Sequence, residues 1–232
     1  IYFMQIKCSI NDGPSLSRNA VAVTAYRKPL PAFQKGSQDI LDQGDCRIRQ
    51  AYYKDGLIHG VYTTSGSAGN GQIIYMISDP EKLLYLTNTL SDPQADIAFP
   101  AVAPASSMQN NKKSLVFFLA SGKNNYPECR MVTVDDLLQF SEPTVVKAGE
   151  GYVDIGAGTT ERWGDYTGLV KTYETHRVSL WAAGSFGNAA NKSGTILAQV
   201  LDQADSVAPF ADQLRFEIFP NPANGMVFIQ TG

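Results

Sequence analysis

One strand-like segment occurs three times in this 232-residue sequence, and the repetition constrains the fold more than any other feature. Each copy is rich in β-branched and aromatic residues, follows another strand-like run, and precedes a Gly/Asn-rich turn and a further apolar run. The copies are LIHGVYTT at 57–64, LVFFLAS at 115–121 and VSLWAAG at 178–184. A recurring unit of four short strands is typical of β-propeller blades.

Short apolar runs that end at Gly, Asn, Asp or Pro predict strands along the whole chain. The predicted strands are 1–6, 20–26, 47–53, 57–64, 72–78, 83–87, 98–103, 114–120, 130–134, 144–146, 166–172, 178–183 and 195–201. Asp55-Gly56 predicts a hairpin turn, because both residues tolerate positive φ. Residues 134–140 are the one helix candidate, with a turn beside a strand as the alternative.

These patterns predict an all-β chain in which residues 1–203 form part of a β-propeller. We expect about three four-stranded blades and a half-blade made of 1–6 and 20–26, with a β-sandwich as the alternative. Propellers typically have four to eight blades. We therefore expect the remainder of the propeller, or a partner chain, to complete the ring.

The charge balance argues against nucleic acid as a partner. Lys and Arg number 19 and Asp and Glu number 22, which gives a formal net charge of -3, whereas nucleic-acid binding needs a basic footprint. The sequence contains no apolar run long enough for a membrane span. Cys8, Cys46 and Cys129 form no CxxC pair, so we expect single buried thiols rather than a zinc or redox site.

Three motifs with distinctive residues lie in the propeller segment: ERWGDYTG at 161–168, SGKNNYP at 121–127, and a run from 42 to 56 that ends in YYKDG. They resemble motifs of large secreted β-propeller proteins of Bacteroidetes-type bacteria, with Asn125 where the second motif usually has Asp. The resemblance covers most of residues 1–203. It implies the fold but no defined activity.

A block near the C-terminal end, residues 216–229, reads FEIFPNPANGMVFI. Pro-Asn-Pro restricts the backbone and ends the preceding strand, and Asn-Gly then turns the chain into an alternating strand. The block resembles the opening of the type A C-terminal sorting domain, a small β-sandwich read by the type IX secretion system. The resemblance implies that four residues carry the sorting signal: Pro220, Asn221, Pro222 and Gly225.

This second resemblance implies a linker at 204–214 and the truncated start of a sorting domain at 215–232. It also implies that the type IX secretion machinery is a partner and that the protein is secreted or displayed on the cell surface. In the linker, Asp205-Ser206-Val207 resembles the O-glycosylation acceptor of the same bacteria, which makes Ser206 a candidate modification site.

Candidate ligand-binding residues cluster around predicted strand entrances: Arg47, Arg162, Trp163, Asp165 and Tyr166. Guanidinium groups bind carboxylates in bidentate pairs, and the aromatic rings could stack on a sugar. The alternatives are an Arg162–Asp165 pair in a turn and aromatic rings that fill the gap between blades.

The expected function is a binding or adhesion module that presents loops to a glycan or surface protein, exported as secretion cargo. The alternative is a glycan-directed hydrolase of the sialidase type, because Glu161 and Asp165 could act as acid and base. The repeated S-x-D-x-G-x-T-W box of sialidases is missing. Convergence of Arg47, Arg162, Asp165 and Glu161 in one pocket would favour the hydrolase, whereas separate ion pairs would favour the binding module.

No cofactor is expected. The alternative is Ca²⁺ held by the acidic loop residues Asp79, Asp92 and Asp96, although these lack the D-x-D-x-D-G spacing of a calcium loop. The Gly-rich run 66–71 lacks the Lys of a phosphate-binding loop and precedes no helix, so it predicts a hairpin tip.

Overall fold

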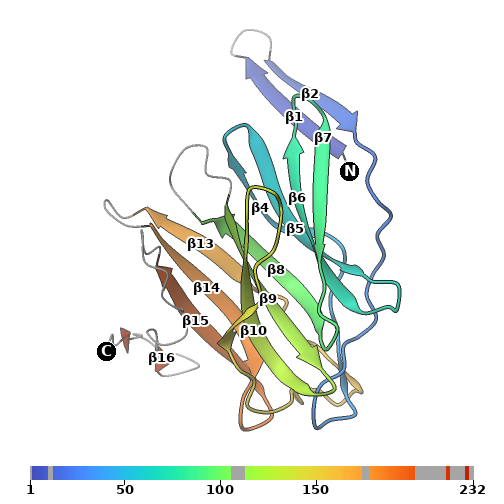
Figure 1. Ribbon diagram of the computed structural model, residues 1–232, viewed down its shortest axis with the longest axis vertical. Coiled ribbons are helices and arrows are strands. Elements are labelled where there is room, and N and C mark those ends of the chain that lie inside the picture. The colour runs from blue at the N-terminus through green and yellow to red at the C-terminus, as the bar shows by residue number, and fades with distance from the viewer. Residues whose placement is uncertain are drawn as a thin grey trace.

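The chain is all-β in a computed structural model that describes residues 2–9, 13–105, 113–173, 178–201, 218–219 and 228–229 (Figure 1). Three antiparallel sheets form most of the described part, which contains no helix. The first sheet consists of β4 (Ile48–Lys54), β5 (Leu57–Ser65), β6 (Gly71–Asp79) and β7 (Leu84–Leu90). The second consists of β8 (Asp96–Pro104), β9 (Ser114–Gly122), β10 (Asn125–Val134) and β11 (Thr144–Lys147).

The third sheet has three described strands: β13 (Gly168–Tyr173), β14 (Val178–Gly187) and β15 (Ser193–Leu201). Three two-stranded sheets complete the described part. They pair β1 (Tyr2–Ser9) with β2 (Gly13–Ala20), β3 (Ile40–Leu41) with β12 (Thr160–Glu161), and β16 (Ile218–Phe219) with β17 (Phe228–Ile229).

The threefold repeat of the sequence corresponds to the same position in each large sheet. The three similar segments are β5, β9 and β14, and each is the second strand of its sheet. The Asp55-Gly56 turn is also confirmed, because φ is 51° at Asp55 and 81° at Gly56, and the pairing of β4 with β5 continues up to this turn, with Lys54 opposite Leu57.

The second sheet lies between the other two and has both faces covered. Every residue of β9 is buried. Leu115, Phe117 and Leu119 face a core shared with the third sheet, whereas Val116 and Phe118 face a core shared with the first sheet. A strand buried on both faces needs a continuous apolar run rather than an alternating one, which explains the sequence LVFFLA.

The first strand of the second sheet, β8, contacts the first strands of the other two sheets, β4 and β13. Phe99 has a φ of 52°, within a bulge of β8. Its N–H donates to Thr63 Oγ1 at 3.2 Å, and its carbonyl accepts from Thr167 Oγ1 at 2.7 Å. These two bonds tie the first and third sheets to the central one.

Three details of the strand prediction are wrong or refined. Residues 21–26 are not part of a strand, because a β-rich composition does not by itself form one; β2 instead lies at Gly13–Ala20 and forms a separate hairpin with β1. The expected half-blade is therefore a two-stranded hairpin. Residues 134–140 form a turn rather than a helix, closed by Asp135 Oδ1, which accepts from Leu137 N and Gln139 N.

The described residues include no helix that is long and apolar enough to cross a membrane. The three cysteines are free thiols, as expected, but only Cys129 is buried, whereas Cys46 is half-buried and Cys8 is exposed. Burial raises the pKa of the Cys129 thiol.

Candidate functional site

Residues 27–44, here called the crossing segment, run along the end of the molecule where the hairpin tips of the first and second sheets lie (Figure 1). Leu30 N donates to Gly69 O, in the turn between β5 and β6. Lys35 N donates to Asn125 O, at the turn between β9 and β10. The segment therefore spans from the hairpin tip of the first sheet to that of the second.

The crossing segment continues to the loop that follows β11. Ile40 N donates to Thr159 O, and β3 pairs in parallel with β12. The same loop reaches the third sheet, because Asp154 N donates to Asn191 O in the turn between β14 and β15. Loops from all three sheets thus gather at this end of the molecule.

Gln34 fixes the middle of the crossing segment. Its side chain is 3% exposed. The amide Nε2 donates to Asp39 O and Val153 O, both at 3.0 Å, and Oε1 accepts from Val153 N at 2.7 Å. One side chain therefore satisfies three backbone groups, in the way that a neighbouring strand would.

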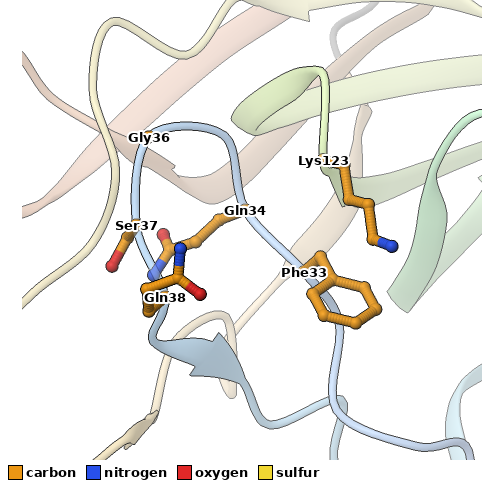
Figure 2. A pocket seen from close by; sticks show the side chains of 6 residues that line it. All are labelled: Phe33, Gln34, Gly36, Ser37, Gln38 and Lys123. Atoms are coloured by element: carbon orange, nitrogen blue, oxygen red, sulfur yellow. The ribbon is translucent and has the colours of Figure 1, made fainter.

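A hollow of about 610 Å³ opens beside this anchor. It is lined by Phe33, Gln34, Gly36, Ser37, Gln38 and Lys123 (Figure 2). Half of Phe33 is exposed, and the Lys123 Nζ lies 4.4 Å from the centroid of its ring. The hollow therefore combines a half-exposed aromatic ring with hydroxyl, amide and ammonium groups.

Phe33 and Lys123 also line a second hollow of about 600 Å³. Its other walls include Asn70, Asp92, Gln94 and Asn124 from the hairpin tips and from the loop before β8. The backbone beneath Phe33 is fixed, because its carbonyl accepts from Ser121 Oγ at 2.8 Å. The exposed ring thus stands on a fixed backbone and lines both hollows.

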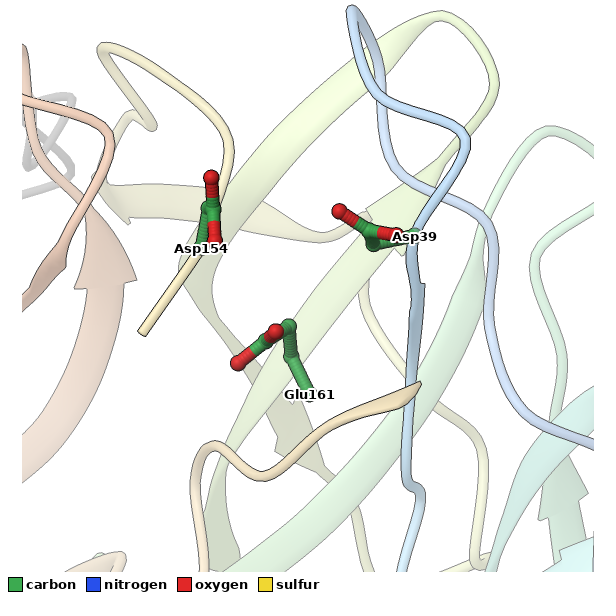
Figure 3. A group of neighbouring side chains, drawn as sticks. All are labelled: Asp39, Asp154 and Glu161. Atoms are coloured by element: carbon green, nitrogen blue, oxygen red, sulfur yellow. The ribbon is translucent and has the colours of Figure 1, made fainter. Parts of the chain in front are cut away.

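A group of three carboxylates lies close to the same loops (Figure 3). Asp39, Asp154 and Glu161 each offer one oxygen, and these oxygens lie within 4.8 Å of one another. Glu161 is buried, Asp39 is half-buried and Asp154 is exposed. These are the described residues that could hold a metal ion.

The sequence-predicted arginines do not converge. Arg47 pairs with Asp45 at 2.6 Å, and Arg162 pairs with Asp165 at 2.5 Å. Both guanidinium groups are largely exposed, and the Asp45 pKa is lowered chiefly by its hydrogen bond from Arg47. Glu161 belongs to the acidic group instead, whereas Asp165 pairs with Arg162, so the two carboxylates proposed as acid and base have different partners.

Trp163 and Tyr166, which were predicted to stack on a ligand, lie in opposite environments. Trp163 is 5% exposed and packs edge-on against Phe99, with ring centroids 6.4 Å apart. Its ring lies in the core and is not accessible for stacking on a ligand, so the stacking role is wrong for Trp163. Tyr166 is 91% exposed, so its role as a ligand-contacting residue stays a prediction.

Gly164 explains much of the ERWGDYTG motif. It has a φ of 73°, and a Cβ there would lie 2.8 Å from Phe99 Cδ2 and even closer to Leu119 Cδ1. Only glycine combines that backbone angle with such close packing. The motif therefore positions the chain against the central sheet.

The predicted calcium residues are dispersed. Asp79 binds Lys82 at 2.9 Å, Asp92 binds Arg130 at 2.5 Å, and Asp96 Oδ1 accepts from Gly71 N at 2.7 Å. Because each carboxylate binds a different partner, the three do not form a shared calcium site. The candidate sorting and modification residues lie outside the described residues: Ser206, Pro220, Asn221, Pro222 and Gly225.

Sequence reasoning missed both the hollow beside Phe33 and the acidic group. An available signal was the aromatic residue within a segment rich in Pro and Gly, PLPAFQKGSQD, since such loops often carry binding residues. The acidic group gave no local signal, because Asp39 and Glu161 are brought together only by the parallel pairing of β3 and β12.

No protein-family model matches the sequence, and no significant match is found among curated proteins.

Proposed function

We propose that the chain is a binding module for a glycan and that the ligand contacts the hollow beside Phe33. The observation that carries this proposal is the half-exposed Phe33 ring on a backbone fixed by Ser121, with polar groups on both sides. A sugar ring presents apolar C–H groups to an aromatic face and hydroxyl groups to polar side chains. Small-molecule sites combine apolar walls with a few polar groups in the same way.

The size of the hollow also supports a ligand of one or a few sugar units. Its volume of about 610 Å³ lies within the roughly 300–1,000 Å³ of typical ligand pockets. Ser37, Gln38 and Lys123 supply hydrogen-bond donors at its rim (Figure 2). The separate Arg47–Asp45 and Arg162–Asp165 pairs argue for binding over the hydrolase alternative.

The propeller is the finer fold that we propose for residues 1–203. Three successive sheets pack face to face, and the first strands of the outer two, β4 and β13, both contact β8. First strands that meet at a common centre are expected when sheets are arranged around an axis. A propeller would present the hairpin tips and the crossing segment on one face of the ring.

Export by the type IX secretion machinery, and hence a secreted or cell-surface location, is proposed from the sequence block at 216–229 alone. This part of the proposal is independent of the hollow. A cell-surface location would suit a glycan-binding module, because its ligands would be outside the cell.

The test is a glycan-array screen of the purified chain, followed by titration of the best ligand into two variants. We expect Phe33→Ala to weaken binding at least about tenfold, a loss of about 1.4 kcal/mol, because the aromatic face is removed. Phe33→Tyr should retain most of the affinity. Tyr166→Ala is the matched control, since it removes an exposed aromatic ring from the predicted RWGDY site.

If Tyr166→Ala lost ligand binding while Phe33→Ala retained it, the binding site would lie at the RWGDY segment instead. Release of reducing sugar by the wild-type chain would favour the hydrolase alternative. Absence of any glycan bound above background would contradict the proposal.

A further inference from the structure

Three carboxylates from three separate segments converge beside the crossing segment. Asp39 precedes β3, Asp154 lies in the loop after β11, and Glu161 ends β12. One oxygen of each lies within 4.8 Å of the other two (Figure 3). Negative charges at this separation repel one another, so the arrangement is unfavourable unless a positive charge lies among them.

The Glu161 side chain gives a second observation, independent of the clustering. It is 1% exposed. Its Oε2 accepts from Ile155 N at 3.1 Å and from Gly156 N at 2.9 Å, whereas its buried Oε1 has no hydrogen-bond partner among the described residues. A buried charged oxygen is expected to be paired or to coordinate a metal.

The backbone holds the carboxylates in place. Thr160 lies opposite Ile40 and Glu161 opposite Leu41 in the parallel pair, and Asp42 N donates to Glu161 O at 2.9 Å. Asp154 is anchored separately through its N–H, which donates to Asn191 O at 3.0 Å. Main-chain hydrogen bonds therefore fix the backbone of the segments that carry the three carboxylates.

Among the described residues, protein cations leave this group of carboxylates unneutralised. None of the ion pairs found within the described residues involves Asp39, Asp154 or Glu161. The Lys192 Nζ donates to the main-chain carbonyl of Asp154 at 2.7 Å rather than to its carboxylate. Lys192 is therefore the nearby protein cation that could compete with a metal ion.

We propose that Asp39, Asp154 and Glu161 bind a calcium ion. The donor set contains only oxygen, which suits a hard cation rather than zinc. Ca²⁺ binds oxygens at about 2.3–2.6 Å, so its ligands lie up to roughly 5 Å apart, whereas the shorter bonds of Mg²⁺ limit that separation to roughly 4 Å. Water and main-chain carbonyl groups complete the coordination of Ca²⁺ in such partly exposed sites.

The ion would join the crossing segment to the loops at the third sheet. Its role is to hold that end of the molecule together, and it stands apart from ligand binding at the Phe33 hollow. Binding to the folded chain alone raises the free energy of unfolding by mass action.

The test is calorimetric titration of CaCl₂ into the chelator-treated chain, together with thermal unfolding in EDTA and in millimolar Ca²⁺. We expect one ion per chain and a rise in the melting temperature with Ca²⁺. Glu161→Gln should weaken Ca²⁺ binding at least about tenfold, or about 1.4 kcal/mol. In EDTA this variant should melt no lower than the wild type, because one of the repelling charges has been removed.

Asp79→Asn is the matched control, since it removes an acidic charge that lies outside the proposed site and pairs with Lys82. The Ca²⁺ affinity and melting shift of this variant should equal those of the wild type. Asp154→Asn covers the case in which Glu161→Gln does not fold, because Asp154 is exposed; it too should weaken binding. Absence of both binding heat and a melting shift at millimolar Ca²⁺ would overturn the proposal. An equal shift with Mg²⁺, or an undiminished Ca²⁺ response in both site variants, would overturn it as well.

Discussion

The second sheet and the crossing segment are held in place by different forces. In the second sheet, every residue of β9 is buried and two apolar cores lie on its faces. The crossing segment instead depends on a few buried polar anchors, chiefly Gln34 and Gln43, while Phe33 and several of its neighbours are exposed. The comparison teaches that burial of apolar surface stabilises the sheets, whereas a small number of amide hydrogen bonds hold the loops that carry the candidate sites.

The largest effect is expected in the second sheet. Phe117 in β9 is fully buried, and it lies so close to Gly184 that a Cβ there would be 2.6 Å from its ring. Phe117→Ala should lower the free energy of unfolding by about 3–5 kcal/mol, because a large cavity replaces the ring. Urea-induced unfolding measures this loss.

Phe33→Ala is the matched control for Phe117→Ala, since it makes the same substitution at a half-exposed site on the crossing segment. We expect it to lower the free energy of unfolding by less than about 1 kcal/mol. Equal losses at the two positions would contradict the view that apolar burial is concentrated in the sheets.

A smaller effect is expected at the polar anchor. Gln34→Ala removes the bonds to Asp39 O, Val153 O and Val153 N. The free energy of unfolding should fall by about 2–4 kcal/mol, because buried backbone groups are left unpaired. Amide hydrogen exchange should also increase at Val153, the residue whose N–H loses its acceptor.

Gln38→Ala is the matched control for Gln34→Ala, because Gln38 is an exposed residue of the same segment. Its free energy of unfolding should stay within about 0.5 kcal/mol of the wild type. A loss at Gln38 as large as that at Gln34 would show that the buried amide is not the anchor.

The same contrast explains which parts could be predicted from the sequence. The apolar run of β9 and the Asp55-Gly56 turn are local patterns, so both predictions are confirmed. The strand predicted at 20–26 is wrong, because strand formation depends on a partner that composition does not reveal.

The candidate sites were harder to predict because their contacts are distant in sequence. Gln34 and Val153 are 119 residues apart, and no local pattern signals such a bond. The conspicuous ERWGDYTG motif was interpreted as a ligand site, yet its Trp163 and Gly164 pack against Phe99. Conspicuous residues can therefore report packing, while inconspicuous glutamine and aspartate residues form the candidate sites.

The smallest predicted effect is on the pH dependence of stability, at the point where the second sheet meets the crossing segment. Asp96 begins β8, and its Oδ1 accepts from Gly71 N at 2.7 Å and from Gln43 Nε2 at 3.3 Å. Burial raises the Asp96 pKa, although these hydrogen bonds oppose the shift. The folded chain therefore holds this proton more tightly than the unfolded chain does.

The free energy of unfolding should consequently contain a contribution from Asp96 that falls as pH rises from the unfolded pKa through the raised folded pKa. Asp79 gives the opposite case, because its hydrogen bond from Lys82 lowers its pKa, so its contribution is lost as pH falls. Urea unfolding of Asp96→Asn and Asp79→Asn between about pH 3 and pH 7, around the ordinary aspartate pKa, measures both. The stability difference between wild type and variant should fall with pH for Asp96→Asn and rise with pH for Asp79→Asn. If the stability difference changed with pH in the same direction for both variants, burial would not be the dominant influence on the Asp96 pKa. The crossing segment would then meet the sheet through an ordinary surface carboxylate.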